Sequence, residues 1–149
     1  MVVPATNFTA AFPKIGYIGI KKIFDKENVN YSRKTIIQAS DLKIDLESMK
    51  LNRNEVTTIS LDIEAMYPSI TFNMVRKAIE FFAKNLNDEQ KVIITDCLKM
   101  IEFGMGNTLI TFKDRYYEYG GSTNIEERGL TIGGYESAWL ADLVASFLL

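Results

Sequence analysis

The sequence contains no histidine and a single cysteine, Cys97, among its 149 residues. Without histidine there is no imidazole for acid and base catalysis or for zinc, and one cysteine forms neither an internal disulfide nor a cysteine zinc site. Carboxylates are therefore the plausible metal ligands, and they suit hard ions such as Mg²⁺ or Mn²⁺. Cys97 lies on the apolar side of a predicted helix, so we expect it to be a core residue.

Long hydrophobic runs are also missing. No stretch approaches the roughly 18 apolar residues that a membrane helix needs, and no basic-then-apolar leader opens the sequence. We therefore expect neither a membrane span nor a secretory signal, and an intracellular protein. The sequence also lacks a Walker loop and a strand followed by Gly-x-Gly-x-x-Gly, so it gives no support for nucleotide binding by a P-loop or Rossmann route.

Charge is unevenly distributed along the chain. The total is −2, yet residues 1–34 hold six basic and two acidic side chains, a net charge of +4, which leaves −6 for the remainder. A basic arm facing an acidic body could hold a phosphate backbone near a metal site, although a solvated surface explains the same charges. Lys14, Lys21 and Lys22 are the candidate contacts to nucleic acid.

Hydrophobic periodicity predicts one compact α+β unit, since nearly half of the residues are apolar. The expected elements are a strand over 57–63, amphipathic helices over 71–86 and 87–104, a β-hairpin around residues 113–114, a glycine turn at 133–134 and a final helix. A further helix after residue 39 would be capped by Ser40. The segment 17–24 fits a strand or a helix equally well.

The stretch TTISLDIEAMYPSI, residues 57–70, places acid at the end of an apolar run. In an extended chain Asp62 and Glu64 would share one face, while their apolar neighbours would point to the other. A structural interpretation is available: Asp62 ends a strand, Glu64 faces solvent and Pro68 fixes the following turn. The functional interpretation makes Asp62 a metal ligand.

Two segments, SLDIEAMYPSI and GLTIGGYESAWLADLVASFLL, together resemble consecutive motifs of reverse transcriptases. SLDIEAMYPSI is similar to the metal-binding palm motif, an aspartate at the end of a strand with an aromatic residue five positions later, here Asp62 and Tyr67. GLTIGGYESAWLADLVASFLL is similar to the next motif of that family, in which a glycine turn, a serine four positions on and a helix follow a short hairpin, here Gly133, Gly134 and Ser137. The two helices and hairpin between them also match, and VVPATNF resembles the Penelope-like and telomerase-related branch.

The sequence departs from the family pattern at three points. Ile132 stands where glutamine often precedes the glycine, and Ala138 stands where a proline commonly follows the serine. The family's hairpin with paired aspartates would come after the last residue. Asp142, the last aspartate present, falls inside a predicted helix, and we expect it to be a surface or structural residue.

The resemblance implies the fingers and palm of a truncated right-hand polymerase, with antiparallel strands packed against helices. Residues 1–55 would be a fingers-derived segment and 56–149 a palm core. Asp62 and the carbonyl of Ile63 would bind two Mg²⁺ or Mn²⁺ ions, Tyr67 would exclude ribonucleotides, and Gly133 and Gly134 would let the backbone approach the nascent base pair. Partners would be deoxynucleoside triphosphates and an RNA or DNA template with its primer.

The parent protein would accordingly be an RNA-directed DNA polymerase, and the 149 residues alone are predicted to be inactive. Two alternatives stay open. One is a non-catalytic, polymerase-like module that binds nucleic acid or protein. The other is the palm of a family B DNA polymerase, whose corresponding motif DIEAMYPSI also resembles, although the Asn-Ser-x-Tyr-Gly pattern that follows it in those enzymes is absent here.

Overall fold

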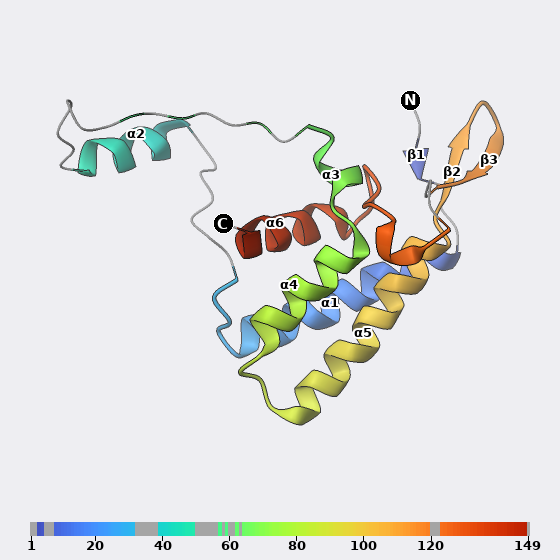
Figure 1. Ribbon diagram of the computed structural model, residues 1–149, viewed down its shortest axis with the longest axis horizontal. Helices are drawn as coiled ribbons and strands as arrows, with labels where there is room; N and C mark the ends of the chain where they lie inside the picture. Colours follow the sequence, from blue (N-terminus) through green and yellow to red (C-terminus); the bar gives the residue numbers. More distant parts are fainter. Residues whose placement is uncertain are drawn as a thin grey trace.

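The computed structural model describes residues 3–4, 8–31, 39–49, 57, 59, 62, 64–119 and 123–148 (Figure 1). In chain order the elements are β1 (Val3–Pro4), η1 (Phe8–Ala10), α1 (Ala11–Lys26), α2 (Ala39–Ser48), α3 (Met66–Ser69), α4 (Phe72–Ala83), α5 (Asp88–Gly106), β2 (Leu109–Phe112), β3 (Arg115–Glu118), η2 (Ile125–Glu127) and α6 (Ser137–Leu148). The chain is therefore α+β, mostly helical with a small antiparallel sheet, as the sequence predicts at this level.

Helices α1, α4, α5 and α6 enclose one hydrophobic core, and α1 packs against α5 along much of its length (Figure 1). The helices approach closely because Gly16 of α1 lies against α5, where an added β-carbon would come within 2.5 Å of the carbonyl oxygen of Cys97. The largest fully buried side chains include Ile20, Phe24, Phe72, Ile79, Ile101, Leu130, Leu140 and Leu143. Packing on α5 thus resolves segment 17–24 as helix.

Local capping signals set the starts of the two central helices. The side chain of Thr71 accepts a hydrogen bond from the N–H of Met74, and Asn87 and Gln90 form a reciprocal capping box at the start of α5. Both helices were predicted from the sequence, although α5 continues two residues beyond Gly104. Cys97 is buried in α5, as expected, and burial raises the pKa of its thiol.

The sheet has the strand order β1-β2-β3, and both pairs are antiparallel. Strands β2 and β3 form the predicted hairpin around Lys113 and Asp114, which both have positive φ angles, of 48° and 58°. Two consecutive residues in this conformation are the mark of a type I′ turn, whose twist matches that of the flanking strands.

Two expectations about local structure, the cap at Ser40 and the strand over 57–63, need correction. Ser40 lies inside α2, which begins at Ala39, so it does not occupy the N-cap position. The apolar stripe of α2 is exposed, with Leu42 at 43% and Leu46 at 51%, and the helix lies away from the other helices (Figure 1). The predicted strand over 57–63 is not formed at residues 57, 59 and 62, and its other positions lie outside the described residues.

Candidate functional site

The segment YPSI, residues 67–70, and the segment 128–130 are joined by backbone hydrogen bonds at and next to their ends. The N–H of Leu130 donates to the carbonyls of Tyr67 and Ile70, at 3.0 and 3.1 Å, and the N–H of Phe72 donates to the carbonyl of Arg128 at 3.0 Å. Thr71 and Gly129 form an isolated antiparallel bridge between these bonds. The tyrosine of the first motif is thereby fixed to the strand-like segment that leads into the glycine turn of the second.

Gly129 makes this junction possible. A β-carbon at Gly129 would overlap the carbonyl oxygen of Pro68 and lie 2.6 Å from its carbonyl carbon. Both neighbours are backbone atoms, so no side-chain rotation would relieve the overlap. Gly129 and Leu130 are not among the residues that the sequence pattern predicted. The available signal was a glycine between the hairpin and the glycine turn, which by itself indicates only a loop.

Tyr67 lies in the short helix α3. This helix directly follows Ala65, which adopts the left-handed conformation with φ 48° and ψ 46°. This reversal turns the chain into α3, which α4 follows after Ile70. The side chain of Tyr67 is half-buried and packs against the hydrophobic core, while its carbonyl accepts the hydrogen bond from Leu130. The backbone of Tyr67 is thus firmly positioned, and its ring is partly accessible.

Asp62 is exposed and belongs to no regular element. The predicted second ligand, the carbonyl of Ile63, lies outside the described residues. An exposed carboxylate is the kind of donor that Mg²⁺ or Mn²⁺ prefers, so Asp62 fits one ligand position. Within the described ranges, no group of three or more histidine, cysteine, aspartate or glutamate side chains is arranged to hold a metal ion.

The glycine turn crowds several polar atoms around one small residue. Gly133 has a φ of 89°, which favours glycine, and the N–H of Gly134 donates to the carbonyl of Thr131. A β-carbon at Gly134 would meet the Ser137 hydroxyl and come within 2.9 Å of both Thr131 Oγ1 and Glu136 Oε1. Gly134 therefore sits where a side chain would fill a polar niche, whereas Gly133 is favoured by its backbone conformation.

Glu136 is the charged residue that the sequence analysis missed. Its side chain is 6% exposed, and burial raises the pKa of its carboxyl above the ordinary value. Ser137, the serine of the second motif, is 1% exposed, and its hydroxyl makes no hydrogen bond in the described structure. Alternation gave no signal for a buried acid, because Glu136 enters the core only where α6 begins.

Of the three predicted lysines, the structure brings one to the glycine turn. Lys14 Nζ lies over the ring of Tyr135, 4.2 Å from its centroid, and Tyr17 packs beside the same ring at 5.6 Å between centroids. Burial and the neighbouring Tyr135 raise the pKa of Tyr17. One face of α1 is thereby placed against the turn of the second motif.

The other two predicted lysines also lie on α1. Lys21 pairs with Asp25 at 2.9 Å, and Asp25 also accepts a hydrogen bond from the hydroxyl of Tyr31. The hydrogen bond with Asp25 raises the pKa of Lys21, and the bonds from Lys21 and Tyr31 lower the pKa of Asp25. Lys22 is exposed on α1. Asp142 is exposed on α6, which confirms its predicted surface position.

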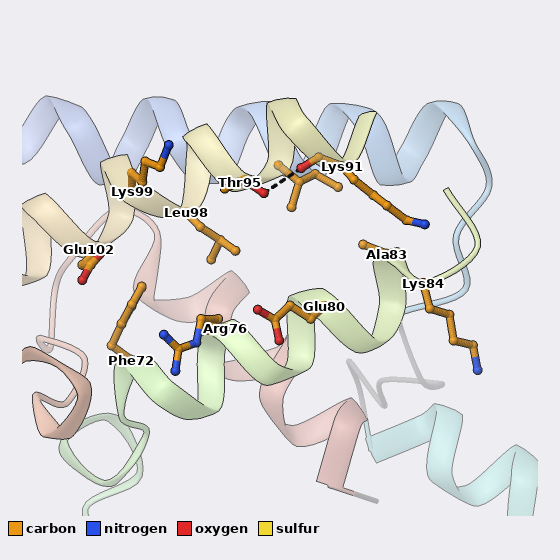
Figure 2. A pocket seen from close by; sticks show the side chains of 11 residues that line it. Phe72, Arg76, Glu80, Ala83, Lys84, Lys91, Thr95, Leu98, Lys99 and Glu102 are labelled. Atoms are coloured by element: carbon orange, nitrogen blue, oxygen red, sulfur yellow. Dashed lines mark hydrogen bonds between the residues drawn. The ribbon is translucent and has the colours of Figure 1, made fainter. Parts of the chain in front are cut away.

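A separate hollow of about 350 Å³ lies between α4 and α5. Figure 2 shows Arg76 and Glu80 of α4 facing Leu98 and Lys91 of α5 across it. Arg76 also forms an ion pair with Glu126 at 2.6 Å, which ties α4 to η2. None of the residues predicted to bind metal, nucleotide or nucleic acid lines this hollow.

Comparison with known proteins adds no relative. No family model, no curated protein and no solved structure matches the chain. None of the helices in the described ranges is long and apolar enough to cross a membrane. The junction between Tyr67 and Leu130 is accordingly the structural feature on which a functional interpretation can be built.

Proposed function

We propose that the chain is the fingers and palm part of a reverse transcriptase, whose full-length parent is an RNA-directed DNA polymerase. The observation that carries this proposal is the junction of YPSI with residues 128–130. The two segments that resemble consecutive palm motifs are adjacent in space, because Leu130 donates to Tyr67 and Gly129 accommodates Pro68. A polymerase requires such adjacency, since both motifs must reach one nucleotide.

In this proposal Asp62 and the carbonyl of Ile63 would hold Mg²⁺ or Mn²⁺, with further carboxylates supplied from outside the described residues. Such ions lower the pKa of the primer hydroxyl and neutralise the triphosphate when they are bound. The chain's own residues supply the shape of the site. The ring of Tyr67 would lie beneath the sugar and leave no room for a 2′-hydroxyl.

The glycine turn would supply the second wall. Without side chains, Gly133 and Gly134 would let the main chain approach the nascent base pair. Lys14 would place a positive charge beside this turn, close to Tyr135. Template, primer and deoxynucleoside triphosphate would then meet between α3 and the start of α6.

Primer extension by the full-length parent tests the proposal. Asp62→Asn should abolish incorporation of deoxynucleotides on a primed RNA template, because it removes the charge on which the metal site depends. Glu64→Gln is the matched control, since Glu64 is another exposed carboxylate two residues away, and it should retain activity. The purified 149 residues should extend no primer.

Each alternative predicts a different result. Extension on DNA templates alone would favour a family B polymerase. A parent without any extension activity would favour an interaction module. Equal loss of activity in Asp62→Asn and Glu64→Gln would refute the assignment of Asp62 as the metal ligand.

A further inference from the structure

The β2–β3 hairpin projects from one end of the molecule, at the right of Figure 1. Its register places Ile110 opposite Tyr117, Phe112 opposite Arg115 and Thr111 opposite Tyr116. Opposed residues in an antiparallel pair share a face, and successive residues alternate. Phe112, Arg115 and Tyr117 therefore lie on one face, which we call the Phe112 face, and Tyr116 lies on the other.

The Phe112 face combines rings with positive charge. The side chains of Phe112 and Tyr117 are 41% and 44% exposed, and Arg115 is also exposed. Lys113 Nζ lies over the ring of Phe112, 5.4 Å from its centroid. Strands β2 and β3 contribute no carboxylate to this face, because Glu118 lies on the opposite face, where it pairs with Arg128 at 2.9 Å.

The turn keeps a lysine where other residues are preferred. Both central positions of a type I′ turn favour asparagine, aspartate or glycine, and a lysine with φ 48° costs on the order of 1 kcal/mol. Asp114 fits this preference, whereas Lys113 does not. The turn nevertheless holds the Lys113 ammonium over the exposed ring of Phe112.

The Phe112 face continues toward the candidate site. The register extends to Tyr119, whose N–H donates to the carbonyl of Thr108 at 2.9 Å, so Tyr119 shares the face of Tyr117. The Tyr119 hydroxyl donates to the carbonyl of Leu130 at 3.2 Å. Leu130 in turn donates its N–H to Tyr67, so the hairpin face and the candidate site are linked through one residue.

We infer that the Phe112 face is a stacking platform for single-stranded nucleic acid. Exposed aromatic rings accept the flat faces of successive bases whatever their sequence, and nearby lysine and arginine side chains neutralise the phosphates. The inference rests on the proposed function and deepens it, since it names the surface that would receive the unpaired template strand.

Fluorescence anisotropy with a labelled, unstructured oligonucleotide of about 15 nucleotides tests the inference, without divalent ions or nucleotides. Phe112→Ala and Tyr117→Ala should each weaken binding about tenfold, the usual loss of one base–ring contact. Tyr116→Ala is the matched control. Tyr116 is 71% exposed, more than either platform ring, but it lies on the opposite face, so its removal should leave binding unchanged.

Two further variants separate stacking from charge. Tyr117→Phe should bind like the wild type, because the ring is kept. Arg115→Gln should weaken binding. In a plot of log affinity against log salt concentration, the slope should become less steep by about 0.7, the value for one lost phosphate contact to a single strand. Circular dichroism confirms folding, and a leucine substitution at the same position replaces any alanine variant that unfolds.

Three results would overturn the inference: equal losses in Tyr116→Ala and Tyr117→Ala, unchanged binding in both Phe112→Ala and Tyr117→Ala, or no binding by the wild type at about 10⁻⁴ M protein, the weak end of non-specific affinities. If the edge of β3 instead pairs with a strand of a partner protein, it would do so through backbone groups, and neither ring variant would change oligonucleotide binding, which is the second result. Any of these would leave the polymerase proposal standing, because Asp62→Asn tests it in a separate assay.

Discussion

Replacing Gly129 by alanine tests whether the two motifs are locked together by backbone contact. The new β-carbon would lie 2.6 Å from the carbonyl carbon of Pro68, whereas non-bonded carbon atoms rest about 3.5–4.0 Å apart. One segment must therefore move by about 1 Å. The hydrogen bonds donated by Leu130 and Phe72, now 3.0–3.1 Å long, would then exceed the normal range.

The energetic cost follows from these two effects. Two backbone N–H donors that lose their acceptors remove about 1–3 kcal/mol, and overpacking costs a similar amount if the chain resists moving. Because relief of one effect increases the other, we expect the free energy of unfolding to fall by about 2–4 kcal/mol in total. That is a large part of the roughly 5–15 kcal/mol that stabilises an ordinary domain.

Urea denaturation followed by circular dichroism measures the change. The midpoint for Gly129→Ala should fall by about 1–2 M. Gly106→Ala is the control, because a β-carbon at the end of α5 would meet only the flexible end of the Ile125 side chain, at 3.3 Å. Its midpoint should stay close to that of the wild type. If Gly129→Ala behaves like Gly106→Ala, the junction is not the constraint described above.

Two further predictions concern the site residues. In the full-length parent, Tyr67→Ala should raise the ratio of ribonucleotide to deoxynucleotide incorporation, and Tyr67→Phe, the control, should preserve it. If the ring only anchors the turn, Tyr67→Ala would lower both incorporation efficiencies equally and leave the ratio unchanged. Because burial raises the pKa of Glu136, the folded protein holds this proton more tightly than the unfolded chain does. The contribution of Glu136 to stability should therefore be fully present below the ordinary glutamate pKa and be lost as pH rises through the raised one. Glu136→Gln should remove this part of the pH dependence from urea midpoints measured between pH 4 and 8, and an unchanged pH dependence would contradict the prediction.

The sequence by itself determined the elements whose signals are local. The starts of α4 and α5 are marked by capping residues, Thr71 for α4 and the pair Asn87 and Gln90 for α5, because a cap involves only the next three residues. The apolar stripe of α4 follows from helical periodicity, and the Lys113–Asp114 hairpin from alternation on both sides of a short turn. Each of these signals lies within one element, so no knowledge of the chain path is required.

Tertiary structure decided what depends on residues that are distant in sequence. Segment 17–24 is a helix because it packs on α5, and Glu136 is buried because α6 begins inside the core. The role of Gly129 depends on Pro68, which only the folded path brings beside it. Periodicity can predict which face of an element is apolar, but it carries no information about which distant backbone that element will meet, and the junction at Tyr67 and Leu130 is a contact of that second kind.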